Sequence, residues 1–381
     1  MSMSQNTESG GGTNLDGVYI LAEILRRGLP FERLPGQMLI VWDPREPSRR
    51  TAFVHSVPQS TRIASVSYLQ EKRFRRSLMT RAGVPVPPGA SFSFSSEKDP
   101  VRFASRIGYP VVVKELFGSN PSFATYDVRD DETLRAAVAR TRSHLPTKDP
   151  DAPSYAQTIN LSTAEEVDGE LLKSPRSRFL IEKQVAGTSY RVYVVAERAR
   201  HALVHVEGEW QTESSPDPTL TDLAERAVSG VSGIESATVD LVQTSDGVTY
   251  LTELCERLVL PHSTSAVRRT FEQVAGALIY SELHSAGFAP RSDEALSAPV
   301  IIDGGLPSDP RSLGPPSNVR AVAPLENKQG GGTLTLHIEP DCDPLELATW
   351  LDATATDRPI RRIYRPRDGT RSDGPARIPT P

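Results

Sequence analysis

Apolar residues recur at helical spacing in five segments of the chain, and each of these segments is predicted to form a helix. Gly28 and Gly83 follow the first two segments, and glycine is common just beyond a helix C-terminus. Ser67 and Gln70 have the spacing of a capping box, so the second helix is expected to begin there. The predicted helices are residues 17–27, 67–82, 131–145, 220–231 and 267–285.

Short apolar runs between these segments predict strands. The run from Tyr109 to Lys114 contains three consecutive valines, which is typical of a strand buried on both faces. Residues 237–242 and 248–254 flank the sequence Thr-Ser-Asp-Gly at 244–247, a favourable hairpin turn. The other predicted strands are residues 38–42, 51–55, 179–183, 190–196, 202–206, 333–338 and 360–364.

Several stretches lack such patterns. Residues 1–15 contain neither a basic region nor an apolar stretch, so they are predicted to be a flexible tail rather than a secretory signal. Residues 146–177 are polar and rich in Pro and Ser, which predicts an insertion or a mobile loop. From about residue 290 the composition shifts to Pro, Gly and Arg, with a small strand–helix–strand appendage and a disordered tail at 366–381.

Composition and charge exclude some classes of function. The chain of 381 residues has a net charge of −5 and a pI of about 5.9, which argues against nucleic acid as a partner. No apolar run approaches the length of a membrane span. The two cysteines form no CxxC pair, which favours a reducing, cytoplasmic location. Only seven of the 43 basic residues are lysines, so each lysine becomes a position of interest.

Asp240 and Glu253 form the strongest chemical signal. They lie on the two strands of the predicted hairpin, and the turn divides the sequence between them almost evenly, so the carboxylates are expected side by side. Two adjacent like charges need a cation or a shared proton, and oxygen ligands of this kind suit Mg²⁺. An exposed, solvent-facing pair is the other interpretation, and the spacing alone does not choose between them.

Two lysines have a similar pair of interpretations. Lys114 ends the valine-rich strand, where a charge is costly unless it meets an anion or solvent. Lys72 lies on the second predicted helix. Each side chain either carries its amine to water along an apolar stem or contacts a phosphate of a ligand.

The order of motifs along residues 15–288 resembles the ATP-grasp superfamily. The motifs are Glu-Lys at 71–72, Gly-Val-Pro-Val-Pro at 83–87, Gly-Tyr-Pro-Val-Val-Val-Lys at 108–114, Phe-Leu-Ile-Glu-Lys-Gln-Val-Ala-Gly at 179–187, Tyr-Arg-Val-Tyr-Val-Val at 190–195, and the segment from Asp240 to Cys255. The section before Lys72 is most similar to the branch that contains cyanophycin synthetase and related peptide ligases. This resemblance implies ATP and Mg²⁺, one or two ions, as cofactors.

The resemblance also implies roles for individual residues. Lys72 and Lys114 match the lysines that contact phosphate, while Asp240 and Glu253 match the metal carboxylates. The hinge that holds adenine matches Glu182, Lys183 and Val185, and the loop that approaches phosphate matches Gly118 and Ser119. Arg191 and His262 match an arginine and a histidine at the substrate end of the peptide-ligase branch.

The sequence also departs from the family pattern. Cys255 occupies the third metal position, usually Asn, and a thiol is a poor ligand for Mg²⁺, which makes a second ion doubtful. Pro121 replaces a glycine of the phosphate loop, and no acidic residue follows the hinge for the ribose. Thr238 stands where the family usually has an arginine. The positive charge of that arginine is expected to come from Arg257, Arg268 or Arg269, and the sequence does not choose among them.

The expected fold is α+β (α/β): two α+β lobes that clasp ATP, a shortened N-terminal lobe and a small C-terminal appendage. The implied boundaries are 1–15 for the tail, 16–66 for the N-terminal lobe, 67–175 and 176–289 for the two ATP-grasp subdomains, 290–365 for the appendage and 366–381 for the second tail. The strand at 334–338 is expected either to extend the main sheet or to form a homodimer contact.

The function implied by the resemblance is that of an ATP-dependent carboxylate–amine ligase. Such an enzyme joins a small carboxylate, such as an amino acid, to an amine through an acylphosphate and releases ADP and phosphate. Two alternatives stay open: a degenerate protein that binds nucleotide or a partner without ligation, and a ligase that loads an amino acid onto a carrier-protein thiol. The departures favour the first alternative, and the retained lysines and carboxylates favour the ligase.

Overall fold

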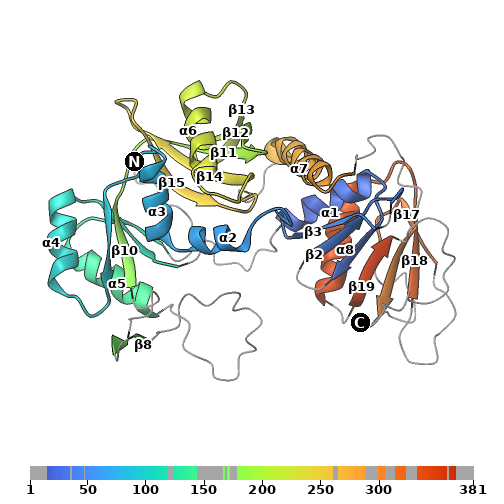
Figure 1. Ribbon diagram of the computed structural model, residues 1–381, viewed down its shortest axis with the longest axis horizontal. Helices are drawn as coiled ribbons and strands as arrows, with labels where there is room; N and C mark the ends of the chain where they lie inside the picture. Colours follow the sequence, from blue (N-terminus) through green and yellow to red (C-terminus); the bar gives the residue numbers. More distant parts are fainter. Residues whose placement is uncertain are drawn as a thin grey trace. The chain divides into compact units, whose positions relative to one another are not determined.

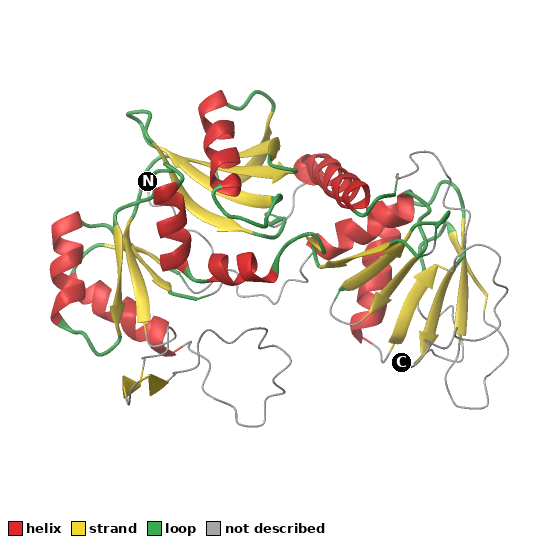
Figure 2. Cartoon of the chain, in the orientation of Figure 1, coloured by secondary structure: helices red, strands yellow, loops and turns green. Residues whose placement is uncertain are grey.

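The structure is a computed structural model of the chain, shown in Figures 1 and 2. It describes residues 15–34, 37–46, 48–117, 124–143, 166–167, 170–171, 178–260, 265–288, 299–304, 314–322, 333–357 and 360–365. These residues form two compact units, the first built mainly from Thr61–Glu256 and the second from Thr13–Ser60 together with the chain from Arg257 onward. Each unit combines helices with antiparallel sheets, so the predicted α+β class is confirmed.

The first sheet of the first unit has four antiparallel strands in the order β5-β10-β6-β7. Helices α4 and α5 pack against one of its faces, where Val111 and Val113 are buried with Phe179 and Ile181. Because side chains alternate along a strand, Lys114 and Glu182 belong to the opposite face. The bounds are β5 Gly89–Ser93, α4 Lys98–Ile107, β6 Val111–Glu115, β7 Thr125–Val128, α5 Asp131–Ser143 and β10 Arg178–Lys183.

The second sheet has five antiparallel strands in the order β13-β12-β11-β14-β15. Helix α6 packs on one face, and Asp217 caps its N-terminus by accepting a hydrogen bond of 2.8 Å from the Thr219 backbone N–H. The apolar alternate residues of β11, β14 and β15 point to this covered face, which forms a continuous core with α6. The bounds are β11 Thr188–Val195, β12 Arg198–Val206, β13 Glu209–Glu213, α6 Pro218–Ser229, β14 Ala237–Gln243 and β15 Thr249–Cys255.

The second predicted helix is two helices, α2 (Ile63–Gln70) and α3 (Lys72–Arg81). The predicted capping box is wrong, because Ser67 lies inside α2 and its hydroxyl donates to the Ile63 carbonyl at 3.0 Å. The break falls at Glu71, whose backbone is extended and forms an antiparallel bridge with Phe117. This long-range pairing interrupts a helix that local spacing alone would continue.

The second unit contains an eight-stranded sheet with the order β17-β18-β16-β19-β1-β2-β3-β4. Strands from both ends of the chain meet where β1 pairs with β19, so the segment after residue 290 completes a sheet that begins before residue 60. Strand β18 lies between β17 and β16 and is therefore paired on both edges. The bounds are α1 Asp16–Arg26, β1 Phe31–Leu34, β2 Met38–Trp42, β3 Arg50–Val54, β4 Val57–Pro58, α7 Ser265–Ser285, β16 Val300–Gly304, β17 Val319–Val322, β18 Thr333–Ile338, α8 Pro344–Asp357 and β19 Ile360–Arg365.

Two further observations complete the fold. Within the predicted insertion at 146–177, the described residues form a two-stranded sheet of β8 (Glu166–Val167) and β9 (Glu170–Leu171). Across the part of the chain that the structure describes, no helix combines the length and apolar character needed to cross a membrane.

Candidate functional site

Two consecutive arginines of α3 each contact a carboxylate, one on each sheet of the first unit. Arg75 forms an ion pair with Glu253 of β15 and also donates to the Leu254 carbonyl at 3.2 Å. Arg76 forms an ion pair with Glu182 of β10. Helix α3 therefore links the polar faces of the two sheets through charge-assisted hydrogen bonds, which are stronger than neutral ones.

Lys114 and Glu182 form the centre of the site on the four-stranded sheet. Their strands are neighbours, and the Lys114 amine lies 2.7 Å from the second carboxylate oxygen of Glu182. Burial lowers the pKa of Lys114, but the Glu182 and Glu253 carboxylates act together against this effect, and the pKa ends above its ordinary value, so the amine stays charged. Burial likewise raises the pKa of Glu182, while Lys114 and Arg76 outweigh that effect and hold the pKa below its ordinary value.

Asp240 and Glu253 lie side by side where β14 pairs with β15, as expected, and a register shift between Asp240 and Leu241 places them directly opposite each other. Both side chains are about a quarter exposed. Arg191 of the neighbouring strand β11 donates to both Asp240 oxygens, from Nε at 2.7 Å and from Nη2 at 2.8 Å. The Arg191 guanidinium also lies over the Trp210 ring, 5.0 Å from its centroid, which is a cation–π contact.

Lys72 begins α3 and is almost fully buried. Burial lowers the pKa of its amine to about 8, and the nearby Arg75 and Lys114 act in the same direction, while Glu253 opposes them. Its backbone N–H donates to the Leu116 carbonyl at 3.0 Å, which places the start of α3 beside the end of β6. Burial and the neighbouring cations therefore disfavour the charged form of the Lys72 amine.

We call the set of eight side chains just described the charge cluster. It has five cations and three carboxylates, an excess of two positive charges. Such an excess at buried positions favours an anionic ligand, because an uncompensated buried charge is costly. Its members are Lys72, Arg75, Arg76, Lys114, Glu182, Arg191, Asp240 and Glu253.

Comparisons with known proteins show similarity to ATP-binding enzymes. The family profile of the carbamoyl-phosphate synthase L chain, ATP binding domain, matches residues 71–148, which include Lys72 and Lys114. A biotin carboxylase from Halalkalibacterium halodurans is 25% identical over 195 residues, covering 49% of this chain and 39% of the relative. A cyanophycin synthetase from Trichormus variabilis is 27% identical over 124 residues, covering 32% of this chain and 13% of the relative. Over part of its length, the chain is therefore similar to ATP-grasp enzymes.

The matched regions span two fifths or less of these curated relatives. Among solved structures, the ATP-grasp RimK domain protein from Sphaerobacter thermophilus has a TM-score of 0.41 and 22% sequence identity, covering 57% of this chain and 69% of that chain.

The hinge residues named by the ATP-grasp resemblance lie at the end of β10. The Lys183 amine donates to the Gly108 carbonyl at 2.9 Å and the Tyr109 carbonyl at 3.0 Å, so its position is fixed by the backbone beside β6. The backbone N–H groups of Lys183 and Gln184 donate to the carbonyls of Pro88 and Pro110. Val185 follows in a half-buried loop, and the adenine role of this segment stays a prediction.

The other predicted ATP-grasp residues have different placements. Gly118, Ser119 and His262 lie outside the described residues. Arg268 belongs to the second unit, where it contacts Glu272 and Asp343, each at 2.7 Å. Arg257, the first of the three candidates for the missing arginine, donates to both oxygens of the buried Asp16 in that same unit.

The residues around Asp240 and Glu253 fit one Mg²⁺ ion with phosphates as further ligands. Both are oxygen donors held opposite each other, and Mg²⁺ is commonly held by one or two carboxylates plus substrate phosphates. Cys255 is buried opposite Thr238, so the third position offers a thiol. Within the described residues, no three His, Cys, Asp or Glu side chains gather as a metal site.

Sequence reasoning missed Arg75 and Arg76 as members of the site. One signal was present: they follow Lys72 by three and four residues, and that spacing places all three on one face of a helix. The helix pattern did not predict which face of α3 is buried. It places Phe74 on the apolar face, but in the structure Phe74 is exposed and Arg75 is buried.

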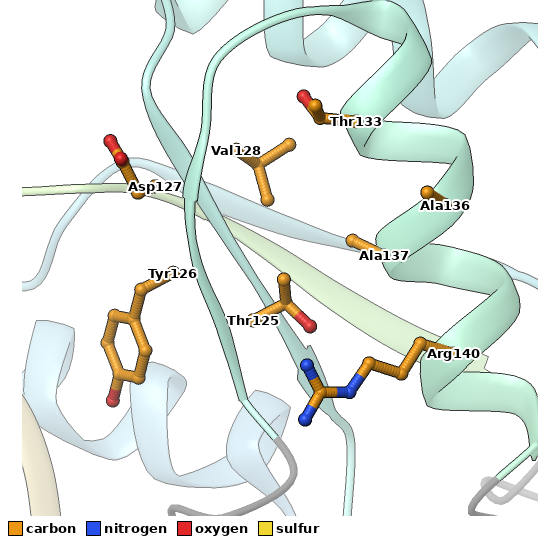
Figure 3. Close-up of a pocket in the computed structure, with 8 residues that line it drawn as sticks. All are labelled: Thr125, Tyr126, Asp127, Val128, Thr133, Ala136, Ala137 and Arg140. Atoms are coloured by element: carbon orange, nitrogen blue, oxygen red, sulfur yellow. The ribbon is translucent and has the colours of Figure 1, made fainter. Parts of the chain in front are cut away.

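A pocket beside β7 is separate from the charge cluster (Figure 3). Figure 3 shows it between β7 and α5, with Val128 and Thr125 toward the helix and Tyr126 pointing away from it. It therefore lies on the helix-covered side of the four-stranded sheet, opposite the face of Lys114. Its lining is Thr125, Tyr126, Asp127, Val128, Thr133, Ala136, Ala137 and Arg140.

Proposed function

We propose that the protein is an ATP-dependent ligase that joins a small carboxylate to an amine through an acylphosphate and releases ADP and phosphate. The observation that carries the proposal is the charge cluster: two lysines and three arginines meet three carboxylates on facing elements of one compact unit. Its excess of positive charge suits a triphosphate. Asp240 and Glu253 supply the ligands that the accompanying metal ion needs.

The proposed reaction has two steps. A carboxylate oxygen of the first substrate attacks the γ-phosphorus of ATP, the bond from that phosphorus to the bridging oxygen breaks, and ADP leaves. The amine nitrogen of the second substrate then attacks the acyl carbon, phosphate leaves, and the amine proton passes to solvent. Lys72 and Lys114 would stabilise charge on the transferring phosphoryl group, which is an electrostatic rather than a covalent contribution.

Mg²⁺, held by Asp240 and Glu253, would neutralise phosphate charge when bound. The chain's own residues supply the rest of the positioning. Arg191, on the strand next to Asp240, is the candidate for binding the substrate carboxylate, since its planar guanidinium matches carboxylate geometry. This role would require Arg191 to exchange its bonds to Asp240 for bonds to the substrate. The contact of Arg191 with the Trp210 ring helps to hold the guanidinium in position.

The test is formation of the activated carboxylate with a general acceptor. Purified protein, ATP and Mg²⁺ are offered single carboxylates together with hydroxylamine, which converts any acylphosphate to a hydroxamate. We expect hydroxamate and an equal amount of ADP with one class of carboxylate. ADP release without hydroxamate, or no turnover with any amino acid or small peptide, would contradict the proposed ligase.

A second candidate function is nucleotide binding without ligation. Two observations favour it, because both weaken the proposed metal site. The Arg191 guanidinium bonds both oxygens of Asp240, and Cys255 offers a thiol instead of an oxygen ligand. This candidate predicts that an ATP analogue binds while no carboxylate stimulates ADP release. The hydroxylamine assay, run beside a calorimetric measurement of nucleotide binding, separates the two candidates.

The proposed contact between Lys72 and phosphate predicts a pH dependence of nucleotide affinity. Because burial lowers the pKa of Lys72 to about 8, the amine loses its proton as the pH rises above that value. Affinity for an ATP analogue should then fall by up to about tenfold per pH unit between about pH 8 and 9.5. The nucleotide's terminal phosphate, with a pKa of about 6, is already ionised there.

The matched control for this pH profile is Lys72→Met. The variant should bind the analogue more weakly than the wild type at about pH 7.5 and show little change up to pH 9.5, because the titrating amine is gone. A wild-type affinity that is constant across this range would show that the Lys72 charge does not face the nucleotide. Calorimetric titration at each pH provides the dissociation constants.

A further inference from the structure

The described carboxylates of the charge cluster are not equally available to a metal ion. Glu182 accepts from Arg76 and from Lys114, so its two oxygens are engaged by cations of the protein itself. Asp240 accepts from one cation, Arg191, through both of its oxygens, and Glu253 accepts from Arg75 through Oε1. These two carboxylates lie opposite each other on β14 and β15. Two carboxylates plus phosphate oxygens satisfy one Mg²⁺, and a second ion would need further oxygen ligands.

The residue that follows Glu253 on the same strand face is Cys255. Residues two apart on a strand point to the same side, so Cys255 is the neighbour from which a further ligand would come. Its thiol is soft, whereas Mg²⁺ prefers oxygen. The side chain is also buried, 4% exposed, against Thr238. At this position β15 therefore offers a thiol in place of an oxygen ligand.

Arg75 already brings a positive charge to Glu253. The arginine is buried, with a side chain only 5% exposed, and it is held by α3 and by its bond to the Leu254 carbonyl at 3.2 Å. This second bond keeps the guanidinium beside β15 independently of Glu253. Arg75 bonds Oε1 of Glu253.

Counting charge across the cluster favours one ion. The eight side chains carry an excess of two positive charges. ATP carries four negative charges, and one divalent cation reduces this to a net charge of −2. That net charge balances the two excess positive charges of the charge cluster. A second divalent ion would leave two uncompensated positive charges at largely buried positions, which is unfavourable.

We propose that the site binds its nucleotide with a single divalent cation, and that the Arg75 guanidinium provides at Glu253 the charge that a second ion would otherwise supply. The inference rests on the proposed function only in that the ligand is a nucleoside triphosphate. It requires neither a ligation step nor a particular substrate. It does assign to a protein side chain a role that would otherwise belong to a metal.

The test is the number of ions bound per nucleotide. Mn²⁺ replaces Mg²⁺, a non-hydrolysable ATP analogue is present at saturation, and electron paramagnetic resonance measures free Mn²⁺ as the protein is titrated. Calorimetry on the same sample measures nucleotide binding. We expect the titration to reach a plateau at one Mn²⁺ per protein–nucleotide complex.

A plateau at two ions would overturn the inference and leave the proposed function intact. If the analogue does not bind at all, both fall together, and calorimetry shows this directly. If the analogue binds with one ion but no carboxylate is activated in the hydroxylamine assay, the inference stands and the ligase proposal fails.

Two variants test the assigned cause. The double variant Arg75→Met with Cys255→Asp removes the resident cation and adds an oxygen ligand, so its plateau should rise to two Mn²⁺. The control, Cys255→Val, removes the thiol without adding a ligand and should stay at one. A double variant that binds the analogue and stays at one ion would overturn the role assigned to Arg75. The wild-type plateau decides the ion number whether or not the variants fold.

Discussion

Replacing Glu253 by Gln is expected to reduce turnover at least about 100-fold, the size of effect seen when one electrostatic contact to a transition state is removed. The substitution keeps the shape of the side chain and removes its charge. The proposed metal ion loses one of its two carboxylates, and Arg75 loses its ion-pair partner. The rate of ADP release in the hydroxylamine assay, with the carboxylate that supports wild-type turnover, measures the effect.

The matched control for this variant is Glu209→Gln, a substitution of the same kind on the exposed end of β13 in the same sheet. It should leave turnover unchanged. Thermal unfolding of both variants separates lost chemistry from lost structure, because Arg75 without Glu253 keeps its bond to the Leu254 carbonyl. A folded Glu253→Gln protein with wild-type turnover would show that the metal ion is held elsewhere.

Replacing Lys114 by Met is expected to weaken binding of an ATP analogue about 100-fold, because it removes a fixed charge that the proposed phosphate contact needs. The same change removes one of the two ion pairs described for Glu182 and keeps the other, with Arg76. Since a buried carboxylate depends on its cations, the variant should also unfold more easily at neutral pH, by about 1–3 kcal/mol.

Lys98→Met, on the exposed start of α4, is the control for Lys114→Met, since it removes the same charge from the same unit without touching the charge cluster. It should bind the analogue like the wild type. Calorimetric dissociation constants and denaturant unfolding compare the two. Unchanged affinity in a folded Lys114→Met protein would exclude a phosphate contact for this lysine.

The parts of the site that could be predicted from sequence depend on short-range geometry. The hairpin brings Asp240 and Glu253 near each other, because its turn determines which parts of the two strands are adjacent. The register of the turn alone would place Asp240 opposite Thr252, and a register shift between Asp240 and Leu241 pairs it with Glu253 instead. The run ending at Lys114 forms β6 as expected, with Val111–Val113 buried. Here the local pattern and the fold agree, so the chain alone was informative.

The parts that could not be predicted depend on contacts between distant residues. Arg75 meets Glu253 across 178 positions, and Arg76 meets Glu182 across 106. Neither pairing leaves a periodic pattern. The break at Glu71 has the same cause, because its bridge to Phe117 competes with the local preference for helix. In the second unit, β1 is only four residues long and pairs with β19 near the other end of the chain.

The adjacency of Arg75 and Arg76 fixes the helical phase of α3. Consecutive side chains leave a helix axis about 100° apart. One turn of α3 can therefore contact a carboxylate on each of the two sheets. Inserting or deleting one residue between Glu71 and Arg75 would rotate both guanidiniums together, and each carboxylate would lose its arginine in a single step. Changes of length in this part of the chain are therefore restricted far more tightly than changes of residue type, and grafting this module onto another protein would need the first turn of α3 carried across intact.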